Sequence, residues 1–223
     1  MFFQNKMCGI GAHDKVLEIG PGATPHHRSD AFLELVFDTA EAKKQQRGGG
    51  EQEANFGQRP VHYYEGECFP FADKQFDYVI CSHVIEHVPD PTRFLAEVFR
   101  VGGGRGYLEY PLMTYEYLYD FDVHLNFVKF DAERRILRYL PKRESPLSEF
   151  SPVTDLFRHM LSQGWDDLCA ANKPLFFEGF EFGHAFTIEK TNDIALLLPP
   201  LEAVAPKGVV RNVVTRLLNK AAI

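Results

Sequence analysis

Three histidines are the side chains whose type and position best suit proton transfer in this 223-residue chain. His83 and His87 follow an apolar, strand-like run, and their spacing of four would place them on one side of a helical turn. An imidazole exchanges a proton near neutral pH, so either could serve as a general base. The alternative is that His83 acts through its backbone and His87 packs in a helix entry. His124 is a further candidate in an aromatic stretch, with a surface position as the alternative.

The run from His83 to His87 also resembles an inverted zinc-peptidase motif, because Glu86 precedes the second histidine. A zinc site needs a third protein ligand, and the spacing places none. We therefore expect no metal ion in this protein.

A glycine-rich turn follows the apolar run Val16-Leu17-Glu18-Ile19. Glycine lacks the Cβ that would hold a ligand away from backbone N–H groups, so Gly20-Pro21-Gly22 can approach a ligand closely. A purely structural turn is the alternative. The third glycine of the dinucleotide-binding fingerprint is missing, because Ala23-Thr24-Pro25 follows, and this argues against a nicotinamide-linked oxidoreductase.

A carboxylate lies at a suitable distance after this turn. In Rossmann-type sites an acidic residue ~20 positions past the glycines accepts hydrogen bonds from ribose hydroxyls at the end of the second strand. Glu34 and Asp38 both lie near that point and share one face of the expected strand. We prefer Glu34, with Asp38 as the alternative.

The elements that position these residues are typical of an α/β fold with a parallel sheet. The helix that begins at Asp90-Pro91 has an Asp N-cap and a Pro at its first position, and Gly102-Gly103-Gly104 ends it. The eight residues between Gly22 and Ala31 are too few for a usual crossover helix, so the first crossover is expected to be shortened. Strands are expected over 16–19, 31–37, 61–64, 78–81 and 107–110.

Three segments in register resemble the motif series of class I S-adenosylmethionine-dependent methyltransferases: V-L-E-I-G-P-G at 16–22, F-P-F-A-D-K-Q-F-D-Y-V at 69–79 and S-H-V-I-E-H-V-P-D-P at 82–91. The similarity extends over roughly residues 14–111 and is closest to the small-molecule branch that includes the ubiquinone and menaquinone methyltransferases. It implies S-adenosylmethionine as cofactor, S-adenosylhomocysteine as product, and a small-molecule acceptor methylated on oxygen, nitrogen or carbon. The alternative is a regulatory protein that binds the cofactor without turnover.

The resemblance also implies roles for the matching residues. Gly20-Pro21-Gly22 would pass beneath the methionine part of the cofactor, and Glu18 would hold its amino end. Within Glu65-Gly66-Glu67, the acid and the small residue match the positions that contact adenine. Ser82 and His83 match the positions that flank the methionine carboxylate and the sulfonium.

The sequence departs from the family pattern in its first crossover, where Pro25-His26-His27-Arg28 replaces most of the first helix. The wall over the ribose is therefore expected to be built differently. The loop after the Asp90 helix also differs, with Val101 to Gly106 in place of lysine-proline-glycine-glycine, but this change does not touch the cofactor contacts.

Beyond residue 111 the chain is rich in aromatic residues, most of them expected in the core and a few on the acceptor side. A hairpin is expected over 124–140, a helix over 153–164, and a last antiparallel strand pair from 176–182 and 184–189. The fold class is a Rossmann-like α/β fold with a mostly parallel central sheet, an antiparallel C-terminal strand pair and added acceptor-side elements. We expect one domain, with a cofactor-binding core over 14–111, an acceptor-side insertion over 112–150, a C-terminal helix and strands over 151–190, and a tail helix over 191–223.

Composition and charge limit the kinds of partner and the compartment that we expect for this protein. A net charge of -7 argues against nucleic acid, because phosphate binding needs a basic face. The sequence has no window of ~18 apolar residues that would predict a transmembrane segment, and its N-terminus has no signal-peptide pattern. The four cysteines form no C-x-x-C pair. We therefore expect a cytoplasmic protein with free thiols. The amphipathic basic tail over 208–223 could dock on its own domain, on a partner or on a membrane surface, and the sequence leaves the oligomeric state open.

Overall fold

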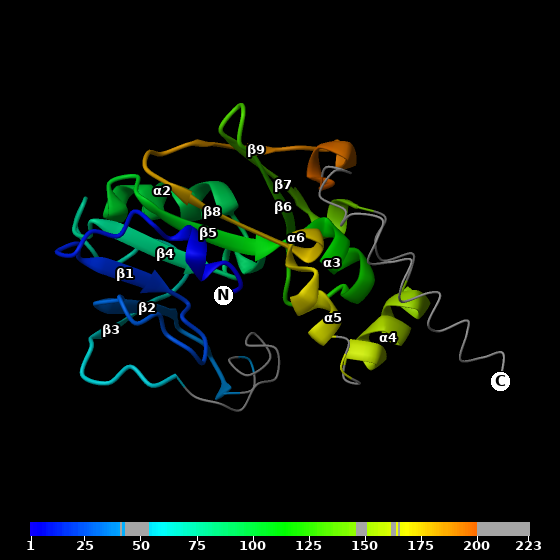
Figure 1. Ribbon diagram of the computed structural model, residues 1–223, viewed down its shortest axis with the longest axis horizontal. Helices are drawn as coiled ribbons and strands as arrows, with labels where there is room; N and C mark the ends of the chain where they lie inside the picture. Colours follow the sequence, from blue (N-terminus) through cyan, green and yellow to red (C-terminus); the bar gives the residue numbers. More distant parts are fainter. Residues whose placement is uncertain (41, 43–53, 146–150, 162–163, 165, 200–223) are drawn as a thin grey trace.

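The computed structural model describes residues 1–40, 42, 54–145, 151–161, 164 and 166–199. Its central sheet has six strands in the order β3-β2-β1-β4-β5-β8 (Figure 1). The first five of these strands in chain order are parallel, and β8 is antiparallel to β5, so the predicted mostly parallel α/β fold is confirmed. The strands are β1 Val16–Ile19, β2 Ala31–Leu35, β3 Val61–Tyr64, β4 Tyr78–Ser82, β5 Gly106–Pro111 and β8 Phe177–Phe182.

A smaller sheet has the order β6-β7-β9, with β6 Asn126–Asp131, β7 Ile136–Pro141 and β9 Thr187–Lys190. The predicted hairpin is confirmed, because β6 and β7 are antiparallel. The prediction that the last two strands pair with each other is wrong. β8 instead joins β5, and β9 lies parallel to β7 in the second sheet. Phe186, between the two strands, is buried against Phe99 and Phe130, so the chain leaves the central sheet there instead of turning back along β8.

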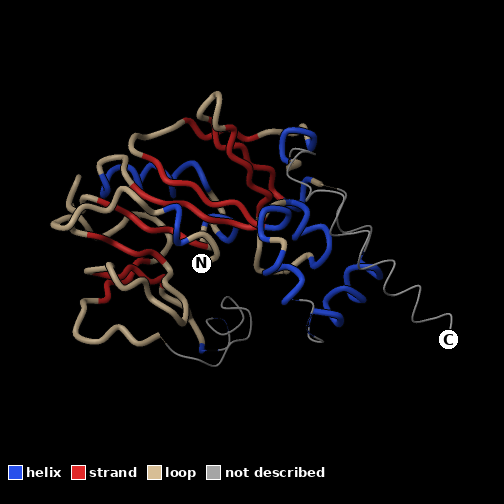
Figure 2. Tube along the Cα trace, viewed as in Figure 1, coloured by secondary structure: helices blue, strands red, loops and turns tan. Residues whose placement is uncertain are grey.

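Helices α3 to α6, labelled in Figure 1, lie together at one end of the central sheet, and Figure 2 shows this group in the same view. Of the described residues, no helix is long and apolar enough to cross a membrane. Of the tail helix predicted over 191–223, residues 200–223 fall outside the described residues, and the described part has only a short 3-10 helix over 194–197. The α-helices are α2 Pro91–Gly102, α3 Met113–Tyr119, α4 Ser151–Met160, α5 Asp166–Ala171 and α6 Lys173–Phe176, and the 3-10 helices are η1 Gln4–Lys6, η2 Ile85–His87, η3 Lys142–Glu144 and η6 Ile194–Leu197.

The two faces of the central sheet are covered differently. Side chains alternate along a strand, so Leu17 and Val79 face α2 and the second sheet in the main hydrophobic core. Val16 and Ile80 face the opposite side, where apolar side chains from residues 1–10 pack against them. A doubly wound fold usually covers that face with helices. Here the N-terminal segment covers part of it.

Helix α2 begins as the sequence predicts, with Pro91 at its first turn and a capping bond from the Arg93 N–H to Asp90 Oδ1 at 3.0 Å. Asp90→Ala removes this acceptor, and we expect the free energy of unfolding to fall by about 1 kcal/mol. Asp90→Ser keeps an acceptor and should recover most of the loss. Urea denaturation followed by circular dichroism measures both variants. Equal losses in the two would contradict the capping role.

Candidate functional site

A cavity of about 1400 Å³ lies at the carboxyl ends of the parallel strands. Residues that line it include Gly20 after β1, Glu34 in β2, Glu65 after β3 and Ser82 at the end of β4. The chain runs outward from β1 to β3 and then returns to β4 on the other side of β1. The strand order therefore reverses between β1 and β4, and α/β sheets bind ligands at such a topological switch point. The cavity is larger than the roughly 300–1,000 Å³ of a pocket for one small ligand.

The turn Gly20-Pro21-Gly22 forms one side of the cavity. Gly20 and Gly22 have left-handed φ angles of 57° and 61°, and the Gly20 N–H donates to the Leu33 carbonyl at 3.0 Å. A Cβ at Gly20 would lie 2.7 Å from Val84 Cγ2. A Cβ at Gly22 would meet no protein atom within 4 Å, so this bare backbone leaves room for a ligand. These features fit the amino-acid part of a nucleoside cofactor.

Glu18 holds together the shortened first crossover. Its Oε2 accepts hydrogen bonds from the His26 N–H at 2.8 Å and the Ser29 hydroxyl at 2.7 Å. Burial raises the pKa of Glu18, and the two hydrogen bonds oppose this shift. No described residue between Gly22 and Ala31 is helical, so the predicted shortening is confirmed. Glu18 also lines the cavity, while its contact with the cofactor amine stays a prediction.

The candidate carboxylates in β2 and after β2 and β3 all line the cavity. Glu34 is buried and directly follows Leu33, which binds the glycine turn, so Glu34 lies beside that turn. Asp38 lies beyond the end of β2 and is exposed. The run Glu65-Gly66-Glu67 follows β3, and Glu67 is 3.5 Å from Arg93 of α2. The register of β2 thus favours Glu34 over Asp38 as the partner of the turn.

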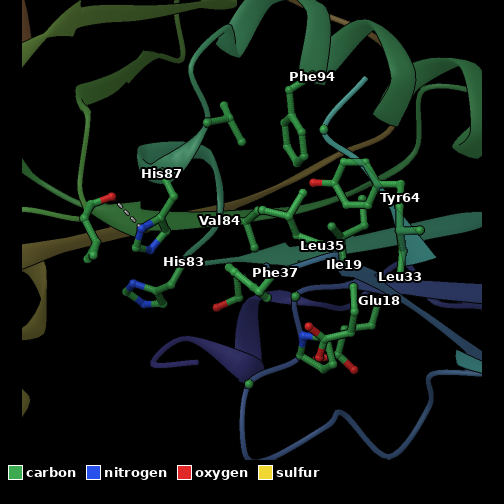
Figure 3. A pocket seen from close by; sticks show the side chains of 18 of the residues that line it. Glu18, Ile19, Leu33, Leu35, Phe37, Tyr64, His83, Val84, His87 and Phe94 are labelled. Atoms are coloured by element: carbon green, nitrogen blue, oxygen red, sulfur yellow. Dashed lines mark hydrogen bonds between the residues drawn. The ribbon is translucent and has the colours of Figure 1, made fainter. Parts of the chain in front are cut away.

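Apolar and aromatic side chains form the wall of the cavity beyond β2 and β3 (Figure 3). Tyr64 and Phe69 meet edge to face at 5.1 Å, and Phe69 and Phe94 at 5.7 Å. Figure 3 shows this wall on one side of the cavity and His83 and His87 on the other. The cavity therefore has an apolar end and a histidine end.

His83, directly after β4, is held between two buried carboxylates. Its Nε2 lies 3.0 Å from Glu109 Oε1 and its Nδ1 lies 3.4 Å from Glu86 Oε1. Burial lowers the pKa of His83, but the hydrogen bond to Glu109 and the negative charges of Glu86 and Glu109 outweigh burial and raise it to about 9. The preceding Ser82 donates its hydroxyl to Glu109 at 3.1 Å. His83 is therefore protonated at neutral pH.

Glu109 is a fully buried carboxylate in β5 that the sequence analysis missed. It accepts hydrogen bonds from the backbone N–H groups of Phe2 and Phe3 and from the Tyr107 hydroxyl, at 2.5 to 3.0 Å. Burial raises its pKa, but the bonds from His83 and Tyr107 outweigh this and lower it to about 2. The feature of the sequence that could have identified Glu109 is its position as a charged residue inside an apolar strand. A charged residue is buried in a strand only when other groups pair with it.

His87 and His124 lie together at the histidine end, with ring centroids 4.5 Å apart. His87 Nδ1 is 2.9 Å from the Val123 carbonyl, and His124 Nδ1 contacts the buried carboxylate of Glu116. Burial lowers the pKa of His87. The structure thus brings all three predicted histidines to the cavity, although their roles stay predictions.

Aromatic side chains surround the histidine end. Tyr115 and Phe121 come from α3 and the loop after it, and Phe177 comes from β8. Phe2, from the N-terminal segment, stacks on Phe177 at 4.1 Å and also lines the cavity. The density of aromatic residues in this region pointed to such a wall, but nothing in the local pattern indicated Phe2.

Residues 17–109 match the model of a family described as methyltransferase domain. The sheet order and the cavity at the switch point agree with this match, and both are typical of class I methyltransferases, which use S-adenosylmethionine as cofactor. The matched segment covers a little under half of the chain. No curated protein matches the chain.

Several solved structures of S-adenosylmethionine-dependent methyltransferases are similar to part of the chain. One from Thermotoga maritima is 25% identical over 47% of this chain and 46% of its own, with a TM-score of 0.32. One from Mesorhizobium loti is 16% identical over 56% of each chain, with a TM-score of 0.33. One from Methanosarcina mazei is 22% identical over 56% of this chain and 69% of its own, with a TM-score of 0.32. The chain spans about half the length of the first two.

Proposed function

We propose that this protein transfers the methyl group of S-adenosylmethionine to oxygen, nitrogen or carbon of a small-molecule acceptor. The observation that supports it most is one cavity that joins the glycine turn after β1, the carboxylates of the next two strands and the histidine end after β4. The sulfonium of the cofactor supplies the electrophile. The protein has to align the acceptor with the methyl group and exclude water.

The cofactor would extend along the carboxyl ends of the strands. Its methionine part would lie over Gly20-Pro21-Gly22, next to Ser82 and Glu18, and its ribose hydroxyls would donate to Glu34. Its adenine would lie against the apolar wall, near Glu65-Gly66-Glu67. A flat ring fits such a wall because aromatic edges and faces pack on it favourably. This placement leaves the histidine end for the acceptor.

The acceptor would lie among the aromatic side chains Tyr115, Phe121 and Phe177, which suit a molecule with a ring or an apolar part. A protonated His83 cannot accept a proton from it, so we assign His83 to positioning, through its backbone and its ion pair with Glu109. His87 and His124 each have one ring nitrogen engaged through Nδ1, and the other nitrogen is suited to act on the acceptor.

Calorimetric titration with S-adenosylmethionine and S-adenosylhomocysteine is the first test, and we expect both to bind well below millimolar concentration. No binding of either at millimolar concentration would contradict the proposal. Release of S-adenosylhomocysteine with a panel of ring-bearing alcohols, phenols and amines then separates the enzyme from its rival. A non-catalytic binding protein would keep the affinity and show no turnover across the panel.

Glu34→Gln tests the ribose contact. A hydrogen bond to a charged acceptor contributes ~1.5–3 kcal/mol, so we expect S-adenosylhomocysteine to bind roughly 10- to 100-fold more weakly. Asp38→Asn is the matched variant, because Asp38 is the competing candidate on the same segment, and its loss should be smaller. A larger loss in Asp38→Asn, measured by the same titration, would transfer the role to Asp38.

A further inference from the structure

Glu86 of η2 is a buried carboxylate whose oxygens lack hydrogen-bond donors among the described residues. Its exposed fraction is 0%, and neither of its oxygens accepts a hydrogen bond from the part of the chain that the structure describes. The nearest basic nitrogens are His83 Nδ1 at 3.4 Å and His87 Nε2 at 3.9 Å. A buried carboxylate without donors is destabilising, and an ion is one of the usual partners for such a group.

The charges around Glu86 do not balance among the described residues. His83 carries at most one positive charge, and it already lies 3.0 Å from Glu109, a second fully buried carboxylate. A third, Glu116, is paired with Lys142 at 3.1 Å, and Lys142 also contacts Asp120 at 2.6 Å. One imidazolium, the Lys142 ammonium and the N-terminal ammonium, which lies 3.8 Å from Glu109 Oε1, thus face four carboxylates. A cation beside Glu86 would offset the charge of the one carboxylate among them whose oxygens accept no hydrogen bond from the described residues.

The two neighbouring histidines each have Nδ1 engaged, as metal-ligating histidines usually have one ring nitrogen engaged. A ligating histidine nearly always donates its second ring N–H to a carbonyl or a carboxylate, which fixes the ring and leaves the other nitrogen for the ion. His87 Nδ1 is engaged by the Val123 carbonyl, and His124 Nδ1 is engaged by Glu116. His87 Nε2 is the nitrogen that points toward Glu86.

The fold brings these residues together from distant parts of the sequence. The Leu125 N–H donates to the Glu86 carbonyl at 2.6 Å, and the Asn126 side-chain amide donates to the Val88 carbonyl at 2.8 Å. These bonds hold the start of β6 against η2 and place His124 beside Glu86 and His87. One ligand atom from each of the three residues lies within 4.8 Å of the other two.

We propose that Glu86, His87 and His124 bind a divalent transition-metal ion at the histidine end of the cavity. Bonds of ~2.1 Å put ligand atoms about 3.0–3.5 Å apart, so rotations of these side chains would close the site. Two imidazoles and one carboxylate suit Zn²⁺, Co²⁺ or Mn²⁺ better than Mg²⁺, which prefers oxygen ligands. Three protein ligands leave coordination positions open. With the ion bound, these two imidazoles would hold it and would no longer act directly on the acceptor. Because His87 and His124 line the cavity, an acceptor oxygen or nitrogen could instead take an open coordination position. This last step rests on the proposed function, and the binding of the ion does not.

The test uses the full chain, freed of metal with a chelator and titrated with Co²⁺ alone by calorimetry and visible absorption. We expect one ion per chain, with absorption bands of a site that has nitrogen ligands, and no competition from millimolar Mg²⁺. His124→Gln and Glu86→Gln should each weaken binding at least ~10-fold. His62→Asn is the matched control, because His62 lies in β3 against Phe71 and does not line the cavity, and its affinity for Co²⁺ should be unchanged.

No Co²⁺ binding below millimolar concentration, or full binding by both variants, would overturn the site. S-adenosylhomocysteine binding and thermal unfolding are measured on the same samples. Variants that lose Co²⁺ but keep S-adenosylhomocysteine affinity support the site, while loss of both together would assign the effect to the fold and overturn it. Because the Co²⁺ titration needs no turnover, a failed metal site and a failed methyltransferase give different results.

Discussion

Gly20→Ala is expected to abolish S-adenosylhomocysteine binding at concentrations that saturate the unaltered protein. The new Cβ would lie 2.7 Å from Val84 Cγ2, and Val84 lines the cavity, so Val84 or the turn has to move. The φ angle of 57° adds strain, because a side chain in the left-handed region costs about 1–2 kcal/mol. With the crowding, the free energy of unfolding should fall by about 2–4 kcal/mol. Calorimetry and urea denaturation measure the two effects.

Gly57→Ala is the matched control for that prediction. Gly57 also has a left-handed φ, of 60°, but a Cβ there meets nothing within 4 Å, and Gly57 does not line the cavity. We expect about 1–2 kcal/mol of lost stability and unchanged binding of S-adenosylhomocysteine. If Gly57→Ala also loses binding, general destabilisation explains the Gly20 result, and the turn is not the cofactor cradle.

The sequence was sufficient to predict the parallel half of the fold because each strand there is an apolar run that ends at a turn. β1 and β3 have the predicted bounds, and β2 ends two residues early, at Leu35. Those turns all lie at one edge of the sheet, so the glycine turn and the candidate carboxylates could be placed at the cavity from their order alone. In this part of the chain, the segments that the local sequence pattern identifies are also the segments that line the cavity.

The partners of the last strands could not be predicted in the same way. A strand pattern shows that a segment is extended, but hydrogen-bond partners depend on which sheet edges are open. β8 pairs with the edge strand β5, and β9 pairs with the edge strand β7. The buried Phe186 lies where the chain passes from one sheet to the other. The same limit applies to His124, which meets Glu86 only through the contacts of Leu125 and Asn126 with η2. Spacing along the chain carries no information about such a meeting.

Glu109→Ala is expected to cause the largest loss of stability of the variants considered. The carboxylate pairs with a protonated His83, and the backbone of Phe2 and Phe3, Ser82 and Tyr107 all donate to it in the interior. Removing one partner of a buried ion pair leaves an uncompensated charge, so the free energy of unfolding should fall by about 3–5 kcal/mol. Urea denaturation at neutral pH measures this change.

Glu181→Ala separates the buried ion pair from the attachment of the N-terminal segment. Glu181 of β8 is more exposed than Glu109, and it also binds that segment, accepting from the Cys8 N–H at 3.3 Å and the Gly9 N–H at 2.7 Å. It accepts a further hydrogen bond from the Tyr78 hydroxyl of β4 at 2.6 Å. Its bonds compete with water, so we expect a loss of only about 1 kcal/mol. A loss equal to that of Glu109→Ala would mean that attachment of residues 1–10 carries the stability. A clearly smaller loss would assign the stability lost in Glu109→Ala to the buried ion pair of Glu109 with His83, beside the histidine end of the cavity.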